Sequence, residues 1–223
     1  MSTIEKSLES YLKTLCSKAE EVGASEAVAI SVADVVVDER VRLKCLVPVC
    51  SFYGRNLMCP PNVMSIPEFK SVLKGYHGAI LIGTDPILPK PPEKLESLSG
   101  LSEAWKTTKP VINGEEQQST TVTDYFHTLR DDWEKLEGVI SHIESLCISE
   151  GYPFAAGLSA GGCLLCDECV GYQSGLPCRH PFRARPSMEA MGIDVVATAR
   201  KAGLHVGFAQ GEPRRWVGLI LVD

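Results

Sequence analysis

The chain has 223 residues, of which 44% are hydrophobic and 22% are charged. This composition is typical of a globular protein and excludes a disordered or collagen-like chain. The formal net charge is −6, so no overall positive charge attracts nucleic acid or an anionic membrane. No apolar run reaches the roughly 18 residues of a membrane span, and the charged N-terminal residues exclude a signal-peptide core. We therefore expect a cytoplasmic protein that binds neither nucleic acid nor membrane.

The N-terminal part of the chain predicts a helix followed by extended structure. Apolar residues recur at three- and four-residue steps over residues 4–22, and Gly23 provides a natural helix end. Residues 27–43 are rich in valine and isoleucine, and apolar and basic residues alternate in their later part. We expect one long strand, or two joined near Asp34, that leads to Cys45.

A short helix and a buried strand come next. Ser65 and Glu68 form a capping box with a proline near the helix start, which predicts a helix that ends at about Lys74. Residues 78–84 are uninterrupted apolar sequence, the pattern of a strand covered on both faces. Together with the preceding strand, these elements predict a βαβ unit with a right-handed crossover.

Residues 85–120 are the least regular part of the sequence. Prolines in this stretch exclude long regular elements; they are Pro86, Pro89, Pro91, Pro92 and Pro110. A connection of this length is often a functional lid. Because none of its residues suggests catalysis, we favour a surface excursion.

The C-terminal half predicts the same kinds of element. Apolar residues alternate steps of four and three over residues 123–149, which indicates a long helix. Residues 154–158 predict a short strand. Asp194 is a candidate cap for a helix through Lys201, and residues 205–208 and 216–222 predict strands.

Nine cysteines are the unusual feature of the composition. They make up about 4% of the chain, well below the ~8–10% of a disulfide scaffold. In a reducing compartment, cysteines at this density favour metal binding or catalysis over disulfides. Cys16 and Cys147 lie on or beside apolar helical faces, and we expect them to pack in the core. The other seven form two groups, the first with Cys45, Cys50 and Cys59 and the second with Cys163, Cys166, Cys169 and Cys178.

The two groups share a pattern. Residues 50–59 and 169–178 both fit Cys-x2-Tyr-x3-Leu-x-Cys, and each follows a predicted helix and strand and precedes another helix and strand. This order indicates an internal pseudo-repeat of helix, strand, cysteine loop, helix and strand. Both loops would then leave the carboxyl ends of sheet strands, where open α/β sheets place their sites.

The second group has the spacing of an iron–sulfur site. Three cysteines separated by two residues each, with a fourth farther along, are the arrangement that wraps a cubane cluster. Structural zinc more often uses paired C-x2-C knuckles well separated in sequence. We therefore predict a [4Fe–4S] cluster on Cys163, Cys166, Cys169 and Cys178, with zinc as the alternative.

The first group leaves more alternatives open. Cys45, Cys50 and Cys59 could hold a second cluster, with one iron open to water, a small ligand or a non-cysteine residue. They could also bind zinc with a borrowed fourth ligand, or simply pack in a loop. We favour a second iron–sulfur cluster, whose open iron could act as a Lewis acid toward a substrate.

Basic residues gather beside the second group, within an otherwise acidic chain: Arg179, His180, Arg183 and Arg185. They could form a solvated loop, compensate the charge of an anionic cluster, or bind an anionic substrate or a redox partner. Glu189 and Asp194 are alternative partners for these arginines. His180 could donate a proton, although a lone histidine is more often structural. No nucleotide-binding or hydrolase motif with convincing context is present.

The cysteine blocks and their flanking sequences resemble a known family. The resemblance rests on Lys44-Cys45, on Cys59-Pro60-Pro61, and on the second block with the residues that follow it, Arg179-His180-Pro181, 184–190 and 192–195. The family is one of unknown function, described as predicted metal-binding proteins and common in anaerobic microbes, and the resemblance spans nearly the whole chain. It implies a metal held by cysteines, with iron–sulfur as the first candidate, and implies no particular reaction.

We therefore expect one α/β domain over residues 1–223, with a mixed central sheet flanked by helices and the cysteine loops at one end. The leading function is an iron–sulfur protein that transfers electrons to a redox partner protein in an anaerobic cytoplasm. A second candidate is an enzyme that binds a small anionic substrate at the open iron, with the arginines orienting it. A third is a zinc-stabilised structural or interaction module.

Overall fold

The computed structural model describes residues 3–87, 120–206 and 215–223. Its helices and strands are, in chain order, α1 (Thr3–Glu21), β1 (Glu26–Ser31), α2 (Leu43–Leu46), α3 (Ile66–Leu73), β2 (Gly78–Thr84), α5 (Thr120–Ser149), β3 (Ala156–Leu158), α6 (Val195–Ala202) and β4 (Trp216–Val222). Short 3₁₀ turns lie between them: η1 (Val32–Asp34), η2 (Glu39–Arg42), η4 (Tyr172–Ser174) and η5 (Glu189–Met191).

The four described strands form one sheet in the order β1-β2-β4-β3. Helices flank this sheet, so the predicted α/β class is confirmed. Every strand pair is antiparallel, however, and the sheet is not mixed. Gly78, the first residue of β2, lies opposite Ser31, the last residue of β1. The chain therefore returns to the end of the sheet where β1 stopped, and the predicted parallel βαβ crossover is wrong.

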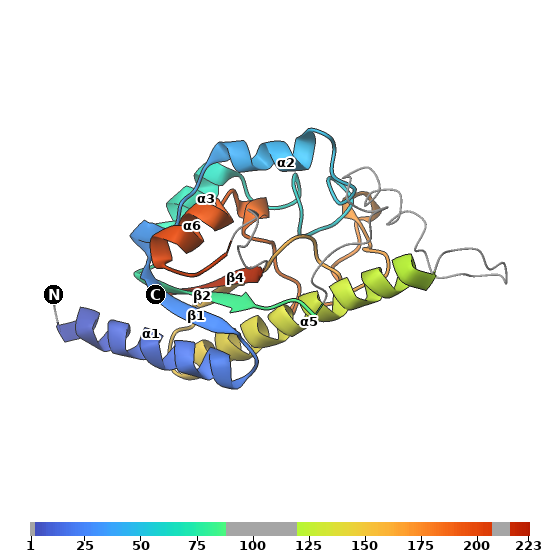
Figure 1. Ribbon diagram of the computed structural model, residues 1–223. Helices are drawn as coiled ribbons and strands as arrows, with labels where there is room; N and C mark the ends of the chain where they lie inside the picture. Colours follow the sequence, from blue (N-terminus) through green and yellow to red (C-terminus); the bar gives the residue numbers. More distant parts are fainter. Residues whose placement is uncertain (1–2, 88–119, 207–214) are drawn as a thin grey trace.

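Helices cover both faces of the sheet, with α1 and α5 on one face and α3 and α6 on the other (Figure 1). Because successive side chains of a strand point to opposite faces, the apolar run of β2 supplies both cores. Ile80 and Ile82 pack in the core that contains the α1 and α5 side chains, whereas Ala79 and Leu81 pack in the core of α3 and α6. This confirms a strand that is covered on both sides.

The predicted pseudo-repeat is present in the order of the elements. The series α1, β1, cysteine loop, α3, β2 is followed by α5, β3, cysteine loop, α6, β4. The strand order is also symmetric, because β2 and β4 form the central antiparallel pair, with Leu81 opposite Leu219, and β1 and β3 form the edges. The order and directions of the four described strands are thus two-fold symmetric about the middle of the sheet.

Local capping fixes the ends of the short helices. In α3, the Glu68 amide donates to the Ser65 hydroxyl at 3.4 Å and the Ser65 amide donates to the Glu68 carboxylate at 2.7 Å, which completes the predicted capping box. In α6, the Ala197 amide donates to Asp194 at 2.9 Å, and Gly203 ends the helix with a φ of 80°.

The region that follows β1 differs from its predicted structure. The strand stops at Ser31, whose hydroxyl accepts a hydrogen bond from the Ala33 amide at 3.3 Å. The Asp38 carboxylate then caps η2 by accepting from the Arg40 amide at 2.8 Å. These side chains compete with a strand ladder for the backbone donors, so residues 32–46 form turns and a short helix instead of a strand.

Other predictions fall wholly or partly beyond the described residues. Of the predicted excursion at residues 85–120, residues 88–119 lie outside them. In the predicted strand at 205–208, His205 and Val206 have no regular secondary structure, and residues 207–208 lie outside the described part. Among the residues that the structure describes, no helix combines the length and apolar character needed to cross a membrane.

Candidate metal centre

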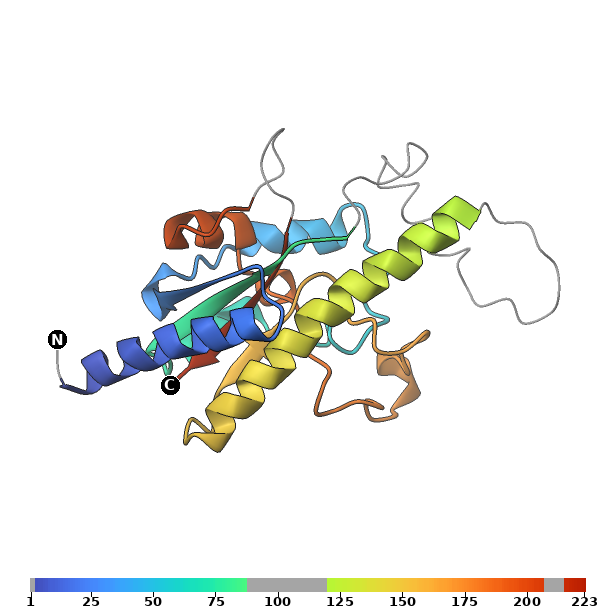
Figure 2. The same ribbon diagram turned by 60° about the horizontal axis from the view of Figure 1, so that its bottom comes forward.

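The two cysteine groups lie at one end of the sheet although their strands point in opposite directions. The antiparallel pairs β1–β2, β2–β4 and β4–β3 make β1 run opposite to β3. The second group follows the carboxyl end of β3 directly. The first group reaches the same end because residues 32–46 run back across the α3 and α6 side of the sheet, as Figures 1 and 2 show. Only the second group therefore directly follows the carboxyl end of a strand, as both groups were predicted to do.

The two loops are joined by direct contacts. The side-chain amide of Asn56 donates to the Cys163 carbonyl at 3.0 Å, and its carbonyl accepts from the Met58 amide at 2.9 Å. Gly162 packs so closely on the Phe52 ring that an added Cβ would lie 2.9 Å from ring carbons. Asn56 is only 4% exposed, so one buried side chain connects the first cysteine loop to the second.

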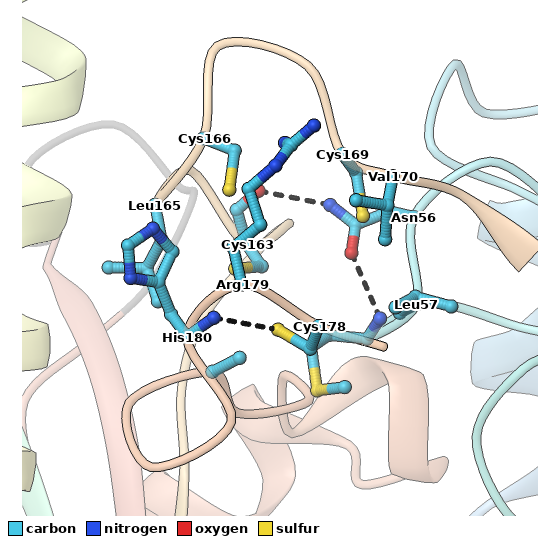
Figure 3. Close-up of a pocket in the computed structure, with 12 residues that line it drawn as sticks. Asn56, Leu57, Cys163, Leu165, Cys166, Cys169, Val170, Cys178, Arg179 and His180 are labelled. Atoms are coloured by element: carbon cyan, nitrogen blue, oxygen red, sulfur yellow. Dashed lines mark hydrogen bonds between the residues drawn. The ribbon is translucent and has the colours of Figure 1, made fainter. Parts of the chain in front are cut away.

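The four cysteines of the second group surround a single pocket (Figure 3). The same pocket is lined by Asn56 from the first loop and by Arg179 and His180. The His180 backbone amide donates to the Cys178 sulfur at 3.3 Å. The free volume is about 20 Å³, close to what one water needs.

Burial and a backbone amide act in opposite directions on the Cys163 thiol. Burial raises the pKa of Cys163 to about 11, whereas the Leu165 amide donates a hydrogen bond that favours the thiolate. The Arg179 guanidinium donates to the Glu168 carbonyl at 2.7 Å and thereby spans the loop. A metal bound at this pocket would displace the thiol protons, because the thiolate is the ligand form of cysteine.

The first group lines a larger cavity of about 270 Å³. Cys45, Cys50 and Cys59 form one side of it, and both loops contribute to the remaining wall: Phe52, Tyr53, Pro60, Gly161, Gly162, Ser187, Glu189 and Ala190. Burial raises the pKa of Cys59 to about 12, and the nearby thiols of both groups add to this rise. The two sets of thiols are thus close enough to interact electrostatically. Within residues 3–87, 120–206 and 215–223, no three His, Cys, Asp or Glu side chains converge closely enough to hold a single metal ion.

The basic residues of the second loop separate into different environments. Arg179 and His180 line the four-cysteine pocket, and Arg183 lies on the exposed loop beyond it. Arg185 is only 7% exposed; it donates to Ser141 at 3.0 Å and pairs with Glu137 and Glu144 of α5. Its partners are therefore not Glu189 or Asp194. None of the four lines the three-cysteine cavity, so the arrangement does not support arginines that orient a substrate there.

The remaining two cysteines pack as predicted. Cys147 is fully buried in the core between α1, α5 and the sheet, and Cys16 packs against the same core. All nine cysteines carry free thiols.

Two residues of the site were not predicted from the sequence as members of it. Asn56 lies between two cysteines of the first group, but an asparagine in a loop usually indicates a turn. Glu189 was considered only as a partner for the arginines, whereas it lines the three-cysteine cavity. The sequence feature that could have indicated Glu189 as a site residue is its position between Ser187 and Ala190, within the residues that carry the family resemblance.

A family model described as predicted metal-binding protein (DUF2284) matches residues 28–222. The match includes all seven cysteines of the two groups. No curated protein and no solved structure matches the chain.

Proposed function

The chain belongs to this family of predicted metal-binding proteins, and we propose that it is an iron–sulfur protein. Cys163, Cys166, Cys169 and Cys178 would hold a [4Fe–4S] cluster. Cys45, Cys50 and Cys59 would hold a second. The proposal includes a role in electron transfer to a partner protein in an anaerobic cytoplasm.

The observation that carries the proposal is the set of four thiols around one pocket (Figure 3). Their C-x2-C-x2-C spacing with a distant fourth cysteine is that of cubane sites, and four thiolates are the donors that such clusters take. The neighbouring groups suit an anionic centre, since Arg179 and His180 line the pocket and the His180 amide points to a ligand sulfur. The present 20 Å³ of free volume requires the loop to widen around an eight-atom core.

The closeness of the two sites supports a role in electron transfer. Bound at these cysteines, the clusters would supply one-electron redox couples whose potentials depend on burial and on hydrogen bonds to sulfur. Asn56 contacts the Cys163 carbonyl from within the first loop, and the Cys59 thiol lies within electrostatic reach of Cys163 and Cys169. Two centres this close favour passage of an electron between them within one chain.

A second candidate function, catalysis at the three-cysteine site, is favoured by the size of its cavity. The 270 Å³ next to Cys45, Cys50 and Cys59 approaches the volume of small-molecule pockets. A site with three thiolate ligands leaves one metal position for a substrate. The other residues of the lining include Gly161, Gly162, Ser187 and Glu189 and no arginine, so a substrate here would be held by hydrogen bonds.

The decisive experiment measures iron, zinc and acid-labile sulfide per chain in protein that has never met oxygen. We expect a coloured protein with iron and sulfide in equal amounts. Cys166→Ser and Cys50→Ser should each remove one population of clusters and leave the other. Cys147→Ser is the matched control, because this buried cysteine lies outside both pockets, and it should retain all the iron.

Two results would count against the proposal. A colourless, sulfide-free protein that carries stoichiometric zinc would indicate the structural zinc module. An unchanged iron content in Cys50→Ser would remove the second cluster and, with it, the catalytic alternative at the three-cysteine cavity.

A further inference from the structure

The three-cysteine cavity contains a buried carboxylate oxygen without a partner. Glu189 lines the cavity together with the thiols of the first loop. Its Oε2 atom has less than 1 Å² of accessible surface and no hydrogen-bond partner. Buried polar atoms are nearly always satisfied, and an exception commonly indicates an ion or a functional role.

The backbone holds Glu189 firmly at this position. The Met188 amide donates to the Ser159 carbonyl at 2.8 Å, and the Ile193 amide donates to the Met188 carbonyl at 2.9 Å. The Ala190 amide donates to the Ser187 hydroxyl at 3.1 Å. Met188 and Ala190 on either side are 0% and 3% exposed. The carboxylate is thus presented to the cavity by a segment anchored at the end of β3.

The thiols of the first loop line the same cavity as Glu189. Turn η2, which leads into the helix of Cys45, contacts η5, which begins with Glu189. A metal at the three thiols would therefore lie beside the Glu189 Oε2 atom, which has no hydrogen-bond partner.

We propose that Glu189 supplies the fourth, non-cysteine ligand of the metal centre at Cys45, Cys50 and Cys59. This inference rests on the proposed function, because it requires a metal at the first cysteine group. Carboxylate oxygen binds iron and zinc in proteins, and a non-cysteine residue replaces cysteine in some iron–sulfur centres. The second half of the pseudo-repeat thus completes the site of the first half. Catalysis at this centre would then require a substrate to displace the carboxylate.

The test loads the full-length protein with ferrous iron and sulfide under anoxic conditions. Cys166→Ser serves as the background, so that iron in the first centre is followed alone. Glu189→Gln keeps the side-chain shape and removes the anionic ligand. We expect it to lose iron to a chelator at least about tenfold faster than the background, since even indirect ligand contacts change metal affinity about 10–100-fold. Glu189→Cys should slow the loss again and alter the Mössbauer spectrum of one iron.

Two comparisons separate a ligand from a structural role. Glu168→Gln is the matched control, because this exposed glutamate lies in the four-cysteine loop outside both pocket linings; it should release iron at the background rate. The second comparison is between the urea unfolding midpoints of metal-free Glu189→Gln and the metal-free background. Equal midpoints show that the substitution does not act by destabilising the fold.

Iron retention in Glu189→Gln equal to that of the background would overturn the inference and leave the iron–sulfur proposal intact. If Glu189→Gln releases iron quickly but Glu189→Cys gives neither slower release nor a new spectrum, Glu189 is not a ligand. If Cys50→Ser contains as much iron as the otherwise native protein, the proposed second cluster itself is wrong.

Discussion

At the scale of single residues, Asn56 determines how the two cysteine loops meet. Its side chain donates to the Cys163 carbonyl and accepts from the Met58 amide, and its backbone carbonyl accepts from the Asn62 side chain at 2.9 Å. An asparagine amide offers a donor and an acceptor on one short, branched side chain. Both functions are used here in a site that water does not reach, so substitution leaves buried backbone groups unpaired.

We expect Asn56→Ala to lower the free energy of unfolding by about 1–3 kcal/mol, because the Met58 amide and the Cys163 carbonyl lose their partner. Urea unfolding of the metal-free chain measures this change. The half-buried Asn62 side chain donates one hydrogen bond, to the Asn56 backbone carbonyl, and its Oδ1 atom accepts none; Asn62→Ala should therefore cost less. Equal stabilities of Asn56→Ala and the parent would show that the loops do not depend on this contact.

At the scale of elements, helix α5 supports the second cysteine loop through a buried ion pair. Arg185 leaves that loop and pairs with Glu137 and Glu144, two carboxylates that lie about two turns apart on α5. Burial raises the pKa of Glu137, and the Arg185 charge opposes this rise. The loop is thereby attached to the longest helix of the described chain.

Arg185→Met should lower the free energy of unfolding by about 3–5 kcal/mol, because it leaves the Glu137 charge buried without its counterion. The double variant Arg185→Met with Glu137→Leu removes the arginine and the more buried of its two carboxylates, and should recover a large part of the loss. Urea unfolding midpoints of the two variants test this. If the double variant is no more stable than the single one, the cost comes from packing and not from the uncompensated carboxylate.

The same helix contains a position where stability should increase. Gly138 lies in the interior of α5, is exposed, and has no atom within 4 Å of the place where a Cβ would stand. Gly138→Ala should raise the free energy of unfolding by about 0.5–1 kcal/mol, because alanine loses less conformational entropy in a helix. Thermal unfolding of the metal-free protein measures the gain.

Gly218 in β4 is the matched contrast for Gly138. A Cβ there would lie 2.5 Å from Ile140 Cδ1 and 3.0 Å from the Leu158 carbonyl oxygen. Gly218→Ala should therefore destabilise the protein by about 1–3 kcal/mol through overpacking between α5 and the sheet. A stabilising effect at Gly218, or a destabilising one at Gly138, would contradict this account of the α5 packing.

At the scale of the whole molecule, the sequence predicted what depends on local signals. The capping box at Ser65 and Glu68, the apolar run at 78–84 and the helix ended by Gly203 were all visible as short patterns, and each forms as expected. The pairing directions were not predictable, because β1 and β2 become antiparallel only through the path of the intervening loop. That path includes caps at Ser31 and Asp38, whose preference for turns outweighed the β-branched composition of residues 32–43.

The same distinction between local patterns and distant contacts applies to the candidate site. The spacing of the second cysteine group predicted that its members lie together, and they do line one pocket, because all four cysteines belong to one continuous loop. Glu189 and Cys45 line the same cavity although they are more than 140 residues apart in sequence. Such a contact carries no local pattern, and only the assembled fold brings it about.

The free energy of unfolding, a property of the whole molecule, should also fall in alkaline solution because of buried thiols that bind no metal. Burial, the largest cause, raises the pKa of Cys147 from 9.0 to about 11. Below pH 9 this thiol is neutral in both the folded and the unfolded chain. Between pH 9 and about 11 the unfolded chain releases the proton more readily, so stability decreases as pH rises through this range.

Cys147→Ala removes this contribution and should give a shallower decrease of the unfolding free energy between pH 9 and 10.5 than the parent chain. The comparison uses reduced, metal-free protein, so that thiolate ligation at the two cysteine groups does not add its own pH dependence. Other raised thiols, such as Cys16 with a pKa of about 12, affect both proteins equally and cancel in the difference. Parallel pH curves for the two proteins would mean that Cys147 titrates alike in the folded and unfolded chain. That result would contradict the raised pKa expected from its place in the core between α1, α5 and the sheet.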